Sequence, residues 1–175
     1  MLLHAVESDY PAIVDLVNLA FRGRGDTASW NVEDIIEGQR INESLLRDDL
    51  ASKPNAHFLL HKDEQGTLLG TVLLDPGPDP GKNAVWYLGL LTVRPNLQKQ
   101  HLGRTLLSAA EAFAKAHGAN TINMTVVNTR KRLIEWYERR GYALTGETRP
   151  FPYGDERFGK PLRDDLHFVV LKKEI

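Results

Sequence analysis

The sequence contains no cysteine, has almost no net charge and has no long hydrophobic run. The absence of cysteine excludes disulfides, thiolate metal ligands and a cysteine nucleophile, and it is typical of proteins in a reducing cytoplasm. The 22 basic and 23 acidic residues leave a formal net charge of -1, so nothing indicates nucleic acid or an anionic membrane as a partner. No segment approaches the roughly 20 apolar residues of a membrane-spanning helix. We therefore expect a cytoplasmic protein that binds neither nucleic acid nor membranes.

Candidate metal ligands are sparse as well. His57 and His61 are four residues apart, but they fall in a strand-like segment and no third ligand lies nearby, so we expect no metal site. The composition is otherwise ordinary, with 42% hydrophobic and 26% charged residues. A chain of 175 residues suffices for one well-packed domain, which we predict over residues 1–175.

The hydrophobic pattern predicts both strands and helices. Apolar or alternating runs predict strands at residues 2–6, 56–62, 67–75, 84–93, 120–127, 142–148 and 165–173. Helical spacing predicts helices at 7–23, 102–118 and 129–141, and two short helices within 32–52, interrupted at Gly38. Consecutive strands favour antiparallel pairing, whereas the helix at 102–118 implies a parallel crossover. We predict an α/β fold in which helices flank a mixed, mostly antiparallel twisted sheet.

The segment VRPNLQKQHLGRTLL (93–107) runs from a strand through a tight turn into a helix. This arrangement collects free backbone N–H groups at the positive end of a helix dipole, where a phosphate binds well. Residues 98–105 occupy that place, and Lys99 and Arg104 add positive charge. The turn has a single glycine, Gly103, and most such connections hold only water. The pattern by itself leaves a ligand loop and a simple connection both open.

The turn and a second motif together are similar to a known family. Val93, Pro95 and then QKQHLGR (98–104) resemble the acetyl-CoA-binding motif Gln/Arg-x-x-Gly-x-Gly/Ala of the GCN5-related N-acetyltransferases, or GNAT proteins. YERRGY (137–142), at the end of the next helix, resembles the family signature Tyr-Glu-x-x-Gly-Phe/Tyr. Element order and motif spacing also agree, so the resemblance covers nearly the whole chain. It implies the GNAT fold, with acetyl-CoA as the co-substrate.

The resemblance also implies where the cofactor binds. The end of the central strand and the turn would hold the pantetheine arm and the pyrophosphate, and the start of the following helix lies beside them. On this pattern the cofactor-binding residues are Leu91, Thr92, Val93, Gln98, Lys99, Gln100, His101, Leu102, Gly103, Arg104, Thr105, Asn128 and Arg130.

Some positions depart from the family pattern. His101 stands where the first glycine is usual, which is tolerable if its backbone is helical and strained if its φ is positive. Gly89 stands where a glutamate often acts as the base, and Arg130 stands where an asparagine is common. The general base is therefore unassigned. Candidates for it are Glu33, Tyr87, Asp155 and Glu156.

The reaction that the resemblance implies is acetyl transfer to a primary amine of a small molecule, by direct attack in a ternary complex. The departing thiolate needs a proton, and a phenol with a pKa of about 10 is a suitable acid. Tyr137 is the catalytic residue that the resemblance implies for this role. On the residues alone, Tyr137 is an amphipathic side chain at the edge of an apolar helix face.

The acceptor of this family usually meets the first helices and the loop before the last strand, here residues 21–40 and 149–161. Aromatic and charged side chains there could line a pocket, or simply pack one loop on the other. Their mixed signs favour a small zwitterionic or carboxylate-bearing amine over a uniformly cationic polyamine. The predicted substrate-binding residues are Trp30, Glu33, Arg40, Tyr87, Phe151, Tyr153, Asp155 and Glu156.

Other functions remain open at this stage. A chain that keeps the cofactor cleft without turnover would be an acyl-CoA-binding sensor, and an enzyme of the same fold could acetylate a protein N-terminus or a lysine. A homodimer is possible, and the final strand at 165–173 could form an edge contact or pack within the sheet.

Overall fold

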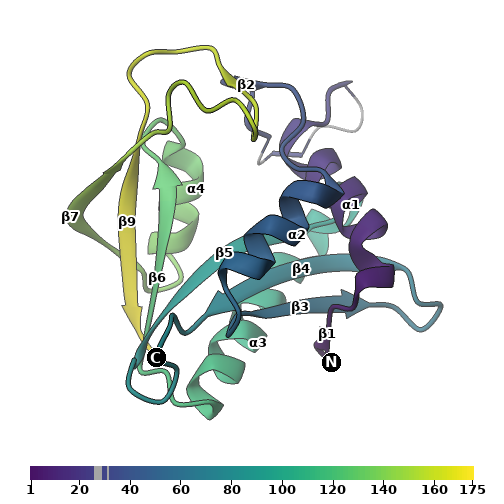
Figure 1. Cartoon of the computed structure of the whole chain (residues 1–175), viewed down its shortest axis with the longest axis vertical. Helices are drawn as coiled ribbons and strands as arrows, with labels where there is room; N and C mark the ends of the chain where they lie inside the picture. Colours follow the sequence, from purple (N-terminus) through teal and green to yellow (C-terminus); the bar gives the residue numbers. More distant parts are fainter. Residues whose placement is uncertain (26–28, 31) are drawn as a thin grey trace.

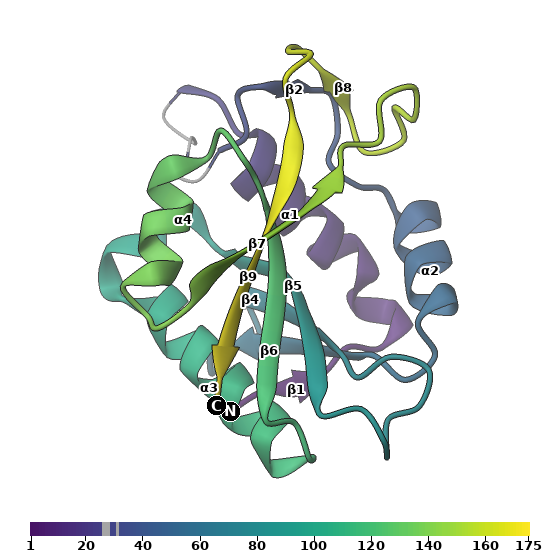
Figure 2. The same ribbon diagram turned by 90° about the vertical axis from the view of Figure 1, so that its left-hand side faces the viewer.

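The computed structural model describes residues 1–25, 29–30 and 32–175, without the side chains of Gln98 and Lys99. Its main sheet has seven strands in the order β1-β3-β4-β5-β6-β9-β7 (Figures 1 and 2). These strands are β1 (Leu3–His4), β3 (His57–Lys62), β4 (Leu68–Asp75), β5 (Val85–Val93), β6 (Thr121–Val127), β7 (Ala143–Pro150) and β9 (His167–Glu174). A separate pair is formed by β2 (Ile36–Glu37) and β8 (Lys160–Pro161).

The helices lie on both faces of the main sheet. They are α1 (Tyr10–Arg22), α2 (Glu43–Ser52), α3 (Leu102–Ala116) and α4 (Lys131–Glu138), with short 3-10 turns η1 (Glu7–Asp9) and η3 (Pro95–Gln100). Apolar residues of α1 and α2 form one buried cluster with β3 and β4. Residues of α3 and α4 form another with β4, β5, β6 and β9. These two cores give the sheet a buried layer on each side. Figure 2 shows α1 and α2 on one side of the sheet and α3 and α4 on the other.

The predicted fold class is confirmed. β5 and β6 pair in parallel, connected through α3, and the other strand pairs recorded for the described residues are antiparallel. The helical pattern at 102–118 corresponds to α3, whose Leu106, Leu107, Ala110 and Ala114 are buried at helical spacing. The extent of one domain over residues 1–175 stays a prediction.

Of the two short helices predicted within 32–52, the second is confirmed and the first is wrong. α2 forms, but the first segment contains β2, which pairs antiparallel with β8. Gly159 makes this pairing possible, since its φ is 116° and a Cβ there would lie 2.6 Å from Ile36 Cγ2. Residues 149–161 are far away in sequence, so a pattern read within 32–40 alone could not indicate this partner.

The central strand leaves its parallel neighbour part of the way along. β5 pairs with β6 from Val85 to Tyr87, opposite Thr121 to Asn123, yet both strands continue beyond that point. On the other side, the register between β4 and β5 shifts between Thr71 and Leu73. Leu90 occupies this bulge with φ 47°, and the Thr71 and Thr92 hydroxyls donate to its carbonyl at 2.9 and 3.0 Å. The sheet therefore opens where the second half of β5 begins.

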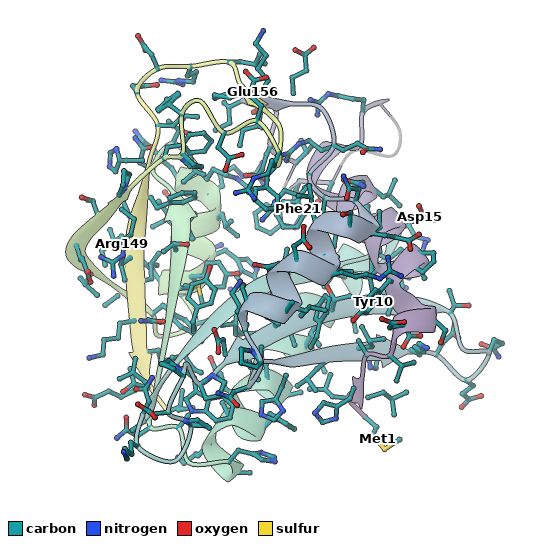
Figure 3. All side chains as sticks on the ribbon, viewed as in Figure 1. Met1, Tyr10, Asp15, Phe21, Arg149 and Glu156 are labelled. Atoms are coloured by element: carbon teal, nitrogen blue, oxygen red, sulfur yellow. The ribbon has the colours of Figure 1, made fainter. Side chains whose placement is uncertain are left out.

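Of the two alternatives left open for the final strand, packing within the sheet is the one that the structure shows. β9 lies inside the sheet, paired with β6 on one side and β7 on the other. The edge strand on this side of the sheet is β7, every residue of which is exposed, and β1 forms the other edge. Figure 3 shows Arg149 on this strand at the margin of the molecule. The homodimer stays a prediction.

None of the helices in the described part of the chain has the length and apolar character that a membrane span requires.

The buried face of α3 gives a direct test of the fold. Leu107 is 2% exposed within the core beneath the sheet, whereas Leu144 on β7 is 48% exposed. We expect Leu107→Ala to lower the free energy of unfolding by about 2–5 kcal/mol, because it removes buried methyl groups and leaves a cavity. Leu144→Ala should change it by less than about 0.5 kcal/mol. Urea denaturation measures both, and equal effects would contradict this packing.

Candidate active site

Two adjacent cavities share lining residues at the point where the sheet opens. The first, at the turn before α3, is lined by Trp30, Leu91, Val93, His101, Gly103, Arg104, Leu133, Trp136, Tyr137 and Arg140. We call it the loop cavity. The second lies between β5 and β6 and includes Glu33, Arg40, Tyr87, Gly89, Arg130 and again Tyr137 among its lining residues. We call it the inner cavity. Tyr137, Leu91 and Leu133 line both, so they mark the junction.

The loop cavity ends at the first turn of α3. η3 ends at Gln100, His101 adopts φ 59° and ψ 15°, and α3 begins at Leu102. The helical backbone that would make a non-glycine tolerable here is therefore absent, because His101 is left-handed. Histidine is among the side chains that reach this region more often than most, at some cost in strain. The sharp reversal lets the 15-residue α3 present its N-terminal N–H groups beside the cavity.

Basic side chains surround this end of α3. The guanidinium of Arg140 stacks 3.7 Å from the ring centre of Trp136, and Arg104 lines the same cavity. Burial, reinforced by the neighbouring Arg139 and Arg104, lowers the pKa of Arg140. Arg140 and Trp136 were missed by sequence reasoning, and the signal that could have found them is their place in the WYERRGY segment. This donor set of helix N–H groups and guanidiniums fits a pyrophosphate.

The remaining residues expected to bind the cofactor fall into two groups, those at the loop cavity or the turn and those that lie elsewhere. Leu91 and Val93 line the loop cavity and Thr92 is buried beside them, while Gln100 and Thr105 are exposed near the turn. Asn128 is used elsewhere, since its side chain accepts from His167 N at 3.0 Å and donates to the carbonyl of Asp165. Arg130 lies in the inner cavity, away from the turn. The side chains of Gln98 and Lys99 lie outside the described residues.

Tyr137 is buried at the junction, with 6% of its surface exposed. It projects from α4 and makes edge contacts with Trp136 and Tyr142. Burial raises its pKa well above the ordinary value of 10.0, and the nearby guanidiniums of Arg130 and Arg140 offset this only in part. The phenol therefore keeps its proton at neutral pH.

Gly89 stands at the position where the family often has a glutamate base. The ring of Tyr87 fills the space that a side chain at position 89 would take. A Cβ at Gly89 would lie 2.9 Å from Tyr87 Cε1, so the ring of Tyr87 lies against the backbone there. The Tyr87 hydroxyl is 3.3 Å from Thr125 Oγ1 on β6, across the opening between the two strands. Glycine has no side chain, so the base of this chain does not come from position 89, and a larger residue there would displace the Tyr87 ring.

The floor of the inner cavity carries a cluster of buried charges. The Glu33 carboxylate lies 2.8 Å from Arg22 Nη1, 4.0 Å from Arg40 Nε and 3.8 Å from Arg130 Nη1. Burial lowers the pKa of both Arg22 and Arg130, while the attraction of Glu33 opposes that change. One carboxylate thus faces three guanidiniums.

A third space of about 270 Å³ shares Glu33, Arg40 and Tyr87 with the inner cavity and is also lined by Ile36 of β2 and by Gly159, just before β8. We call it the outer cavity. Five of the predicted substrate-binding residues line it, namely Glu33, Arg40, Tyr87, Phe151 and Asp155. Three others do not. Trp30 lies beside Trp136 at the loop cavity, and the Tyr153 hydroxyl accepts from Leu166 N at 2.9 Å. Figure 3 shows Glu156 at the top of the loop between β7 and β8.

Among the described residues, no group of three or more His, Cys, Asp or Glu is placed to hold a metal ion.

These features define an α/β fold with a cleft between the halves of one opened sheet and, at its mouth, a turn whose geometry and charge suit an anion. The profile of the Acetyltransferase (GNAT) family matches residues 12–142, which is most of the chain, and the chain belongs to that family. The recognised resemblance is thereby confirmed.

Individual relatives agree with this assignment. A mycothiol acetyltransferase of Propionibacterium freudenreichii subsp. shermanii is 32% identical over 92 residues, covering 51% of this chain and 28% of that protein. The chain thus spans about a quarter of that relative's length. A ribosomal-protein-alanine N-acetyltransferase from Brucella melitensis superposes with a TM-score of 0.70 at 18% identity, over 100% of this chain and 99% of the other. A Salmonella typhimurium structure that contains its cofactor acetyl-CoA gives 0.66 at 17%, over 99% and 92%. At such identities the structures show a shared fold.

The left-handed backbone of His101 predicts a stabilising substitution. We expect His101→Gly to raise the free energy of unfolding by about 0.5–1 kcal/mol, because relief of the left-handed strain exceeds the extra entropy of an unfolded glycine. His117→Gly is the matched control, since His117 has φ -104° and should lose stability on the same change. Thermal and urea denaturation measure both. A loss of stability in His101→Gly would contradict the strain.

Proposed function

We propose that the protein is an acetyl-CoA-dependent N-acetyltransferase that moves an acetyl group to a primary amine of a small molecule, by direct attack in a ternary complex. The observation that carries this proposal is the position of Tyr137. Its side chain belongs both to the loop cavity, which suits a pyrophosphate, and to the inner cavity, which leads to the outer one. A proton donor there serves a transfer between two ligands that enter from opposite sides.

The cofactor would be held by the chain's own backbone and basic residues. The N-terminus of α3 with Arg104 and Arg140 suits the pyrophosphate. Thr92 and Val93 of β5 pair with β4, but Leu91 to Val93 do not pair with β6, so their free edge suits the pantetheine amides as an added strand would. Acetyl-CoA supplies, when bound, an acetyl group activated as a thioester. The similar structure solved with acetyl-CoA supports this choice of cofactor.

A small acceptor is supported by the roof of the outer cavity. The β2–β8 pair and the loop carrying Phe151 close over it, and its volume of about 270 Å³ suits a molecule of modest size. An extended peptide would need an open groove through this roof. We therefore favour a small molecule over a protein acceptor.

The buried residues can meet two demands of the reaction. Tyr137 holds its proton at neutral pH, so its hydroxyl can stabilise a departing thiolate by donating a hydrogen bond that becomes a proton transfer as the thiolate leaves. The amine must be neutral to attack, and the guanidiniums of Arg22, Arg40 and Arg130 disfavour an ammonium beside them. Repulsion from these cations helps the acceptor to lose its proton.

Binding of acetyl-CoA is the first test. We expect a dissociation constant on the order of 1 μM, or about -8 kcal/mol, by calorimetry at fixed salt, with dephospho-CoA as the comparison ligand. Absence of binding would leave the family likeness as one of fold alone and would overturn the proposal.

Removal of one hydroxyl tests the catalytic residue. We expect Tyr137→Phe to lower kcat by about 100-fold or more without weakening acetyl-CoA binding, because it removes the proton donor. Burial raises the pKa of Tyr137 above 10.0, so the phenol stays protonated as the pH is raised to 10. Loss of this proton should therefore cause no decrease in kcat of the unaltered enzyme at any pH below 10. Steady-state kinetics and calorimetry measure these effects.

Tyr142→Phe is the matched control for that change. Tyr142 is also buried, but its hydroxyl donates to Glu111 at 2.9 Å, away from the junction. We expect about 1 kcal/mol less stability and an unchanged kcat. If Tyr137→Phe kept the full rate, Tyr137 would not be the acid.

A further inference from the structure

We infer that the acceptor is a small amine that also carries a carboxylate, as an α-amino acid does, and that Arg40 binds this carboxylate. The inference rests on the proposed function and names the substrate class of the same site. It follows from the balance of charge in the inner and outer cavities, from the state of the acidic residues at the rim, and from the surroundings of Arg40.

The balance of buried charge favours an anion. Three guanidiniums lie within 4.0 Å of the single carboxylate of Glu33. The side chains of Arg22, Arg130 and Glu33 are 7%, 11% and 9% exposed, so water screens these charges poorly. Asp34 also attracts Arg130, but it lies on the exposed side of the cluster. Glu33 lies 2.8 Å from Arg22 and 4.0 Å from Arg40, so among the described residues its single charge is matched by Arg22 and does not also neutralise Arg40.

The acidic residues at the rim do not reverse this balance. Asp49 is paired with Lys53, one turn along α2. Asp155 is bound by Arg157 through several hydrogen bonds between 2.7 and 3.2 Å. Both carboxylates are already compensated by a neighbouring base. A polyamine would therefore bring cations into a cavity whose interior is cationic and whose acids are engaged.

Arg22 and Arg40 differ in how their guanidiniums are used. Arg22 donates to Glu33 at 2.8 Å, to the Phe158 carbonyl at 2.8 Å and to the Phe21 carbonyl at 3.4 Å. These bonds tie α1 to the loop before β8, so Arg22 acts as a structural link. Arg40 Nε, in contrast, lies 4.0 Å from Glu33, which is beyond hydrogen-bond distance.

The surroundings of Arg40 hold its guanidinium in place. Its Cζ lies 5.8 Å from the ring centre of Phe21 and 5.3 Å from that of Phe158. Its backbone N–H donates to Asn18 at 2.7 Å, which fixes the chain at this point. The side chain is 27% exposed and lines both the inner and the outer cavity. A guanidinium held by aromatic rings, with donors left to use, suits the bidentate binding of a carboxylate.

Arg40 and Tyr137 line the same inner cavity. An acceptor whose carboxylate meets Arg40 therefore has its amine in the cavity that leads to Tyr137. A short molecule that carries both groups satisfies this geometry, and its carboxylate offsets the surplus positive charge.

The test compares matched amines with and without the carboxylate. Amino acids with apolar, aromatic, polar and acidic side chains are paired with their decarboxylated counterparts, and acetyl transfer is measured by thiol release at fixed acetyl-CoA. We expect the carboxylate-bearing member of at least one pair to have the higher kcat/KM. In Arg40→Gln this preference should fall by about 10- to 100-fold, mainly through KM, since a charge-assisted hydrogen bond is lost.

Two controls separate the possible failures. Arg47→Gln removes an exposed arginine of α2 that lines neither the inner nor the outer cavity, and it should leave the preference unchanged. Calorimetry of acetyl-CoA on the same protein tests the proposed function independently. If acetyl-CoA does not bind, both proposals fail. If it binds but no carboxylate-bearing amine is acetylated, or if Arg40→Gln keeps the full preference, the carboxylate inference alone is overturned.

Discussion

The separation of β5 from β6 beyond Tyr87 and Asn123 is the constraint on which the site depends. A parallel pair that continued to Val93 would bury its backbone groups in the sheet and leave no opening. The bulge at Leu90 and the change in register against β4 turn the second half of β5 away from its neighbour. Tyr87 then reaches across the opening to Thr125, α4 brings Tyr137 to its inner end, and α3 begins at its mouth.

Charge burial is the second constraint. A carboxylate and guanidiniums removed from water are costly unless they compensate one another, and Glu33 compensates its nearest partner, Arg22, best. The same ion pair joins the end of α1 to the segment before β2, while Arg22 also holds the loop before β8. The roof of the outer cavity and the charge of its floor are thus linked through one side chain. The positive charge of Arg40, which Glu33 does not neutralise, faces these partly open cavities, and an anionic ligand can compensate it.

The departures from the family pattern have different structural consequences. His101 keeps the sharp turn at the cost of a left-handed backbone, so the helix N-terminus still faces the loop cavity. The absence of a side chain at Gly89 leaves room for the ring of Tyr87, which fills the space that a longer side chain would need. His101 therefore affects local stability, whereas Gly89 affects which side chains line the inner cavity. Neither departure by itself indicates that the protein has lost activity.

The sequence by itself determined the α/β class, the helices α1, α3 and α4, the parallel crossover after β5 and the two motifs of the family. These features depend on neighbours within about ten residues, through hydrophobic periodicity and helix-ending glycines. Only the tertiary structure decided that residues 36–37 form a strand, that β9 is internal, that Asn128 is engaged by β9 and that Trp30 lies beside Trp136. It also brought Arg22, Glu33, Arg40 and Arg130 together. The physical reason is that each of these outcomes depends on contacts between segments distant in the chain, and local propensity carries no information about such contacts.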